Sequence, residues 1–211
     1  MTETTEATSE SAMVAEAAEA IEAPDPRVAR PPLAWAQAVL VRRRTFLMPV
    51  AAIVMLIVAN PRPEMFWPGA ALLALCNLLR LRCAGYIDKD NSLVRCGPYA
   101  WCRNPLYVAN LGVGLAFVLI CGRWEVLALI VIGWLATHIP TVANEERFLH
   151  EKFNDQFEDY CECVPRWLPR IPRIEGSAHR FMWRKVALNK EHINIISNWL
   201  VVAIFYIEMV K

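Results

Sequence analysis

The stretch that decides the fold is residues 104–144, which read NPLYVANLGVGLAFVLICGRWEVLALIVIGWLATHIPTVAN. It holds two runs of 19 residues without a charged side chain, 104–122 and 126–144, joined by a short polar link. A helix needs about 20 apolar residues to cross the hydrocarbon layer of a membrane. The two runs therefore predict a hairpin of membrane-spanning helices whose free ends lie on one side of the bilayer.

Three other apolar segments are shorter or interrupted by polar residues: 45–60, 65–79 and 193–207. Apolar residues make up 56% of the chain, whereas soluble domains usually hold about 45–50%. This composition argues against a standard soluble enzyme and against a fibrous protein. Together the five segments predict an all-α fold, a polytopic membrane helix bundle with four to five transmembrane helices.

The distribution of charge predicts the orientation and the domain boundaries. Residues 1–25 hold seven acidic and no basic side chains, which leaves 22 basic against 14 acidic residues, or +8, in the rest. The links 61–64 and 123–125 hold one Arg each, whereas the basic residues within 27–44, 80–103 and 147–190 fall on the opposite side, which is expected to be cytoplasmic. We expect a disordered acidic tail over 1–32 and an integral, multi-pass membrane domain over 33–211.

One chemically distinctive segment, residues 93–107, reads LVRCGPYAWCRNPLY. Gly97-Pro98 predicts a turn, and Pro105 is well placed in the first turn of the helix that follows. Arg103 at the cytoplasmic N-terminus of a helix would attract an anion such as a carboxylate. The alternative is an ordinary loop with an interfacial arginine.

A second distinctive segment begins at Glu145 and Glu146, at the end of the long apolar run. Apolar side chains then recur at helical spacing, which predicts an amphipathic helix on the cytoplasmic surface; they are Leu149, Phe153, Phe157 and Tyr160. The two carboxylates could hold a cation, or they could face water as a helix-end pair. The hairpin returns both segments to one membrane face, so that cationic and anionic groups would flank a cleft suited to a zwitterionic amino acid.

The order of these motifs resembles the isoprenylcysteine carboxyl methyltransferase family, which is related to the membrane phospholipid methyltransferases. The resemblance spans residues 91–170 and rests on Gly97-Pro98-Tyr99, Arg103-Asn104-Pro105-x-Tyr107, Glu145-Glu146-x-x-Leu149, Tyr160 and Val164-Pro165-Arg166. Three positions depart from the frequent family pattern. Asn104 stands where many members have His, Ala100 replaces a frequent Arg, and Ala109 replaces a frequent Gly.

The resemblance implies a multi-span enzyme that binds S-adenosylmethionine at the cytoplasmic face and takes a lipid or isoprenoid-like acceptor from the bilayer. It implies catalytic roles for Arg103, Glu145 and Glu146. The residues that it implies for cofactor binding are Gly97, Pro98, Tyr99, Arg103, Asn104, Tyr107, Glu145, Glu146, Leu149, Tyr160 and Arg166. No metal is expected, because the seven cysteines show no zinc-ligand spacing, and no nucleic-acid partner is expected.

The expected reaction is transfer of a methyl group to a lipophilic acceptor, with a carboxylate favoured. A carboxylate needs no deprotonation near neutral pH, and Asn104 cannot shuttle a proton as a histidine can. The alternatives are a phospholipid amine, a thiol, or a non-catalytic membrane scaffold with the same fold. A transporter is less favoured, since no paired repeat of spans is visible. His138, inside an apolar run, is predicted to be packed and hydrogen-bonded rather than a proton carrier.

Overall fold

The computed structural model describes residues 53–87, 92–171 and 180–211, and every regular element in them is helical. The all-α class is thereby confirmed. The predicted tail (1–32) and residues 45–52 of the first predicted span lie outside the described residues. Residues 53–58 are helical, and the elements that follow are α3 (Pro63–Tyr86), the 3₁₀ turn η1 (Gly97–Ala100), α4 (Pro105–Cys121), α5 (Glu125–Phe153), α6 (Asp155–Cys163), α7 (Trp183–Leu188) and α8 (Glu191–Val210).

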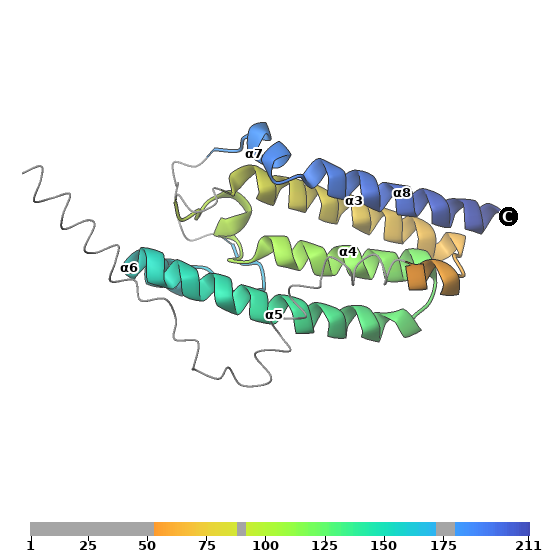
Figure 1. Ribbon diagram of the computed structural model, residues 1–211, viewed down its shortest axis with the longest axis horizontal. Coiled ribbons are helices and arrows are strands. Elements are labelled where there is room, and N and C mark those ends of the chain that lie inside the picture. Colours follow the sequence, from red (N-terminus) through yellow and green to blue (C-terminus); the bar gives the residue numbers. More distant parts are fainter. Residues whose placement is uncertain (1–52, 88–91, 172–179) are drawn as a thin grey trace, which may run out of the picture. The chain divides into compact units, whose positions relative to one another are not determined.

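The long helices run side by side along one direction, with α3 between α8 and α4, and α4 between α3 and α5 (Figure 1). The chain enters α4 and α8 at the end of the bundle where it leaves α3 and α5 (Figure 1). That end also carries η1, α6 and α7. The two chemically distinctive segments therefore meet at one end of the bundle, as the predicted hairpin requires.

The helix boundaries follow from the local sequence. Pro63 and Pro105 each occupy the first helical position, where the missing N–H is not needed. Gly122 ends α4 with a φ of 69°, and a Cβ atom there would lie 2.3 Å from the carbonyl oxygen of Asn60. Glycine is thus required both for the left-handed conformation and for the close approach of the chain.

The second distinctive segment is not one continuous surface helix, which corrects the prediction from the sequence. Helix α5 continues past Glu146 as far as Phe153, and Asn154, with a φ of 40°, separates it from α6. The apolar side chains that were expected on one helix still gather. Phe157, Tyr160 and Val164 form a buried cluster against which Leu149 and Phe153 pack.

The outward faces of two helices are strongly apolar. Helices α5 and α8 are long and apolar enough to cross a membrane, and α4 is a shorter apolar helix of 17 residues. Large aliphatic side chains remain exposed along both helices; among them are Leu129, Ile132 and Ile139 on α5 and Ile196, Leu200 and Ile207 on α8. A membrane would cover such surfaces. A membrane helical bundle fits these faces, while the number of four to five spans stays a prediction.

Candidate active site

The carboxylate of Glu146 is the centre of the site. Its Oε1 accepts hydrogen bonds from Arg103 Nε at 3.3 Å and from Asn104 Nδ2 at 2.9 Å. Arg166 Nε lies 2.9 Å from Oε2, at ion-pair distance but without hydrogen-bond alignment. The Glu146 side chain is only 15% exposed. Two guanidinium groups around one carboxylate leave a surplus positive charge at this point.

Hydrogen bonds to backbone carbonyls hold the segments 103–104 and 161–166 of the site together. The N–H of Arg103 donates to the carbonyl of Pro165 at 2.9 Å, and Arg103 Nη1 donates to the carbonyl of Cys161 at 3.2 Å. Asn104 Nδ2 also donates to the carbonyl of Arg166 at 3.3 Å. Residues that lie about sixty positions apart in the chain are thereby fixed against each other around Glu146.

The Gly97-Pro98-Tyr99 turn packs beside this cluster as η1. Gly97 has a φ of 59°, and a Cβ atom there would lie 2.7 Å from the ring of Tyr86. The hydroxyl of Tyr160 donates to the carbonyl of Tyr99 at 2.7 Å. Tyr160 is 3% exposed, and burial raises its pKa well above the ordinary value. It therefore stays a neutral hydrogen-bond donor that anchors the turn.

Glu145 points to a different partner from its neighbour, as expected for adjacent positions on a helix. The hydroxyl of Tyr107 donates to Glu145 Oε1 at 2.6 Å, and the Glu145 residue is exposed. Trp134 Nε1 donates to the carbonyl of Tyr107 at 3.0 Å. An accessible negative charge thus lies on the residue next to the buried, positively compensated Glu146.

His138 is a packed histidine, which confirms the prediction for this residue. It is buried, its Nδ1 lies 2.8 Å from Thr137 Oγ1, and its ring stacks on that of Trp134 at 5.3 Å between centroids. The ring of Tyr107 meets it edge-on, also at 5.3 Å. His138 therefore supports the tyrosine that reaches Glu145.

The structure brings together most of the residues expected from the sequence, with one exception and one addition. Leu149 packs in the apolar cluster of α6 and supplies no polar group. Sequence reasoning missed Cys102, which is buried and donates through Sγ to the carbonyls of Arg166 and Trp167 at 3.4 and 3.2 Å. Burial raises the pKa of this thiol, so that it acts as a neutral donor. Its position inside the first motif was the only signal.

The arrangement fits a ligand that carries both a carboxylate and an ammonium group. The surplus positive charge of Arg103 and Arg166 suits an anion, and the exposed carboxylate of Glu145 suits a cation. These charges are held by short loops and by adjacent positions of one helix. The donor set therefore fits the amino-acid part of S-adenosylmethionine.

Comparison with known proteins finds a methyltransferase family and a relative that is named as a methyltransferase. Residues 73–156 match the phospholipid methyltransferase family, which confirms the resemblance predicted from the sequence. The chain is 31% identical over 85 residues to protein-S-isoprenylcysteine O-methyltransferase of Schizosaccharomyces pombe, a match that covers 40% of this chain and 36% of that protein.

Two bacterial relatives carry names of another kind. The chain is 32% identical over 118 residues to the cobalt-zinc-cadmium resistance protein of Cupriavidus metallidurans, covering 55% of this chain and 54% of that protein. It is 33% identical over 128 residues to the nickel-cobalt-cadmium resistance protein of Alcaligenes xylosoxydans xylosoxydans, covering 56% and 60%. The chain thus spans about half the length of these two curated relatives.

Proposed function

We propose that this chain, which matches the phospholipid methyltransferase family over residues 73–156, is an integral membrane methyltransferase that uses S-adenosylmethionine. The observation that supports the proposal best is the cluster of Arg103, Asn104 and Arg166 around the Glu146 carboxylate. A purely structural ion pair needs one cation for one anion. A second arginine at the same carboxylate favours a site that receives a further negative group.

Different residues of the site would bind different groups of the cofactor. Arg103 and Arg166 would attract its carboxylate, and Glu145 with Tyr107 would hold its ammonium group. The turn anchored by Tyr160 would cover it and exclude water. When bound there, S-adenosylmethionine supplies an electrophilic methyl group on a sulfonium. Glu146 would orient the two arginines rather than exchange a proton.

The acceptor that we propose is a lipophilic carboxylate that enters from the bilayer at the cytoplasmic face. In the transfer, an acceptor oxygen forms a bond to the methyl carbon while the carbon–sulfur bond breaks and its electron pair stays on sulfur. No proton moves, so the site needs alignment more than it needs a base. The products are a methyl ester and a neutral thioether.

Three alternatives remain as competing proposals. A phospholipid amine would need a base, for which Glu145 is the accessible carboxylate; the name of the matching family suggests this acceptor, whereas the name of the Schizosaccharomyces pombe relative suggests a carboxylate. A thiol acceptor would have to lose its proton in the same way. A non-catalytic scaffold draws support from the two relatives named for metal resistance, since neither name states an enzyme activity.

The decisive experiment uses membranes that contain the protein and S-adenosylmethionine labelled in its methyl group. Lipids are extracted, separated and treated with base, for wild type, Glu146→Gln, Arg103→Ala and a matched control, Glu151→Gln, an exposed carboxylate on the same helix. We expect a base-labile labelled lipid with wild type and with the control, and none with the other two variants. Base-stable label would indicate an amine or thiol acceptor. Failure of the purified protein to bind the cofactor would favour the scaffold.

A further inference from the structure

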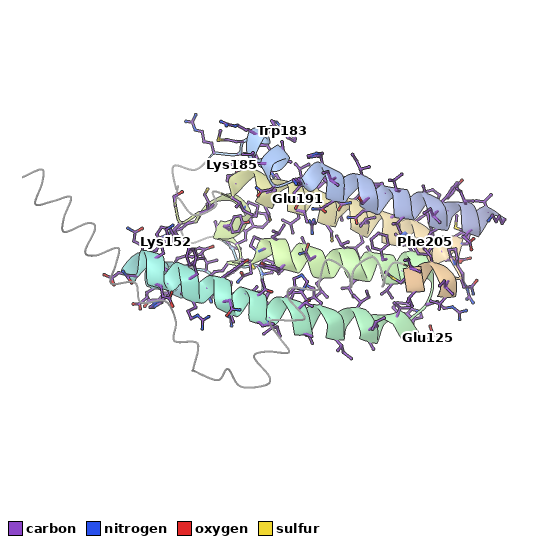
Figure 2. The ribbon with its side chains drawn as sticks, viewed as in Figure 1. Glu125, Lys152, Trp183, Lys185, Glu191 and Phe205 are labelled. Atoms are coloured by element: carbon purple, nitrogen blue, oxygen red, sulfur yellow. The ribbon has the colours of Figure 1, made fainter. Side chains whose placement is uncertain are left out.

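A second buried carboxylate, outside the candidate site, connects three helices. Glu191, in the first turn of α8, is 5% exposed. It receives Arg80 of α3, whose Nη2 lies 2.9 Å from both carboxylate oxygens and whose Nε lies 3.2 Å from Oε2. Figure 2 shows Glu191 where α8 begins, beside α3. Charges held among apolar helices in this way mark a function more often than a need of the fold.

The remaining nitrogen of the guanidinium group reaches the helix that carries the candidate site. Arg80 Nη1 donates a hydrogen bond to Asn110 Oδ1 on α4. Asn110 lies three residues after Tyr107 and six after Asn104. Successive residues of a helix turn by about 100°, so Asn110 and Tyr107 are only about 60° apart around α4. A bond that fixes the direction of Asn110 therefore also fixes the direction of Tyr107.

We infer that Arg80, held in place by Glu191, is a positioning residue for methyl transfer that acts through Asn110. The bond to Asn110 sets the rotation and height of α4, so that Asn104 meets Glu146 and Tyr107 meets Glu145. Arg80 itself touches none of these four side chains through any hydrogen bond or ion pair of the described residues. The effect on methyl transfer rests on the proposed function. The effect on the position of α4 rests on the contacts of α4 alone.

The same interface offers a matched control that does not reach α4. Asn198 of α8 donates from Nδ2 to Oδ1 of the buried Asn77 of α3 at 3.0 Å. Asn198→Leu removes one polar contact between α3 and α8, as Asn110→Leu removes one between α3 and α4. Both variants replace an amide with an apolar group of similar size. Only Asn110→Leu should disturb the candidate site.

The test measures two quantities on the full chain in detergent: the dissociation constant of S-adenosylmethionine and the hydrogen exchange of the backbone amides of residues 107–112. We expect Asn110→Leu to weaken cofactor binding about tenfold, as the loss of a hydrogen bond to a charged group should, and to speed exchange in this segment. Asn198→Leu should leave binding within about twofold of wild type. The charge swap Arg80→Glu with Glu191→Arg restores an ion pair between α3 and α8 but not the donor to Asn110 Oδ1, so cofactor binding should stay about as weak as in Asn110→Leu.

Equal cofactor affinity and equal exchange in Asn110→Leu and Asn198→Leu would overturn the positioning role. So would a charge swap that bound the cofactor as tightly as wild type, because that protein lacks the donor to Asn110. If the wild-type protein bound no S-adenosylmethionine, the proposed function would fail, and hydrogen exchange would then decide the positioning role. Faster exchange over 107–112 in Asn110→Leu but not in Asn198→Leu would support it, and equal exchange would refute it.

Discussion

Two carboxylates of this protein, Glu146 and Glu191, have nearly the same kinds of partner and differ in charge balance. Each accepts hydrogen bonds from an arginine and an asparagine. Glu146 has a second arginine within ion-pair distance, whereas Arg80 is the only cation paired with Glu191 among the residues that the structure describes. The first cluster therefore keeps a spare positive charge, and the second is neutral. Spare charge in a partly buried place favours a ligand, while neutrality favours a fixed joint between helices.

The two clusters also differ in what holds their cations. Arg103 and Arg166 lie on short loops joined by hydrogen bonds to backbone carbonyls. Arg80 and Glu191 lie on long helices whose directions are already fixed by packing. Loops can adjust when a ligand arrives, and the helices supply the fixed frame. The predictions below test this division, beginning with the change that should have the largest effect.

The largest effect is expected from Glu146→Gln. The substitution leaves Arg103 and Arg166 without the carboxylate that orients them, and breaking such a buried pair costs about 3 kcal/mol, or a factor of about 100. We expect methyl transfer, measured as kcat/KM from initial rates, to fall by at least about that factor. Glu145→Gln removes the adjacent charge and should have a smaller effect. A Glu146→Gln protein that kept more than a tenth of the activity would contradict the central role of this carboxylate.

The next largest effect is expected on stability, from Arg80→Gln. Glu191 would remain buried without its cation, at a cost of roughly 2–3 kcal/mol. For a chain of this length that corresponds to a fall of roughly 5–10 °C in the midpoint of thermal unfolding in detergent. The charge swap at positions 80 and 191 should recover much of the loss. An unchanged midpoint for Arg80→Gln would show that the pair is not a joint between helices.

Much of the first cluster could be predicted from the sequence, because its residues lie next to strong local signals. Pro105 marks the start of α4, and the long apolar run ends beside Glu145 and Glu146. Their convergence followed from the hairpin. What could not be predicted was the break at Asn154, since a positive φ at asparagine leaves no clear signal in an apolar repeat.

The second cluster could not be predicted, because it depends on contacts between distant helices. In the sequence, Arg80 directly follows the apolar segment 65–79, and Glu191 lies just before the apolar segment 193–207. Nothing local indicates that residues 111 positions apart form a pair. Asn110 is equally inconspicuous among apolar neighbours. Only the packing of α3 against both α8 and α4 brings these polar groups together (Figure 1).

A moderate effect is expected from Asn104→Ala, at the position where the resemblance would favour histidine. The variant removes the donor to Glu146 and to the Arg166 carbonyl, at a cost of about 1.5 kcal/mol and about tenfold in cofactor affinity. Asn104→His should retain more affinity than Asn104→Ala, because an imidazole N–H can replace the amide donor. Equilibrium binding of S-adenosylmethionine to both variants tests this. Equal affinities would mean that the donor at position 104 does not orient Glu146.

A similar effect on stability is expected from high pH through Tyr160. Its pKa is raised in the folded protein, whereas in the unfolded chain it is near 10. The folded state therefore keeps its proton where the unfolded state loses one, so the stabilisation present below pH 10 is lost as the pH rises above it. The slope should be about 1.4 kcal/mol per pH unit. Denaturant unfolding at pH 9 and pH 11, compared with Tyr160→Phe, measures the difference, and equal slopes for the two proteins would argue against a buried neutral phenol.

The smallest effect is expected from Tyr107→Phe. This variant tests the contribution of Glu145 to cofactor binding separately from that of Glu146. The Tyr107 hydroxyl donates to Glu145, and the exposed Glu145 can replace that bond with water. A cost of about 0.5–1 kcal/mol, or roughly two- to fivefold in cofactor affinity, is therefore expected. Thermal stability should not change, since the ring keeps its contact with His138. If Tyr107→Phe weakened binding as strongly as Glu146→Gln, the exposed carboxylate would be as important for binding as the buried one. The spare positive charge around Glu146 would then not explain the affinity of the site.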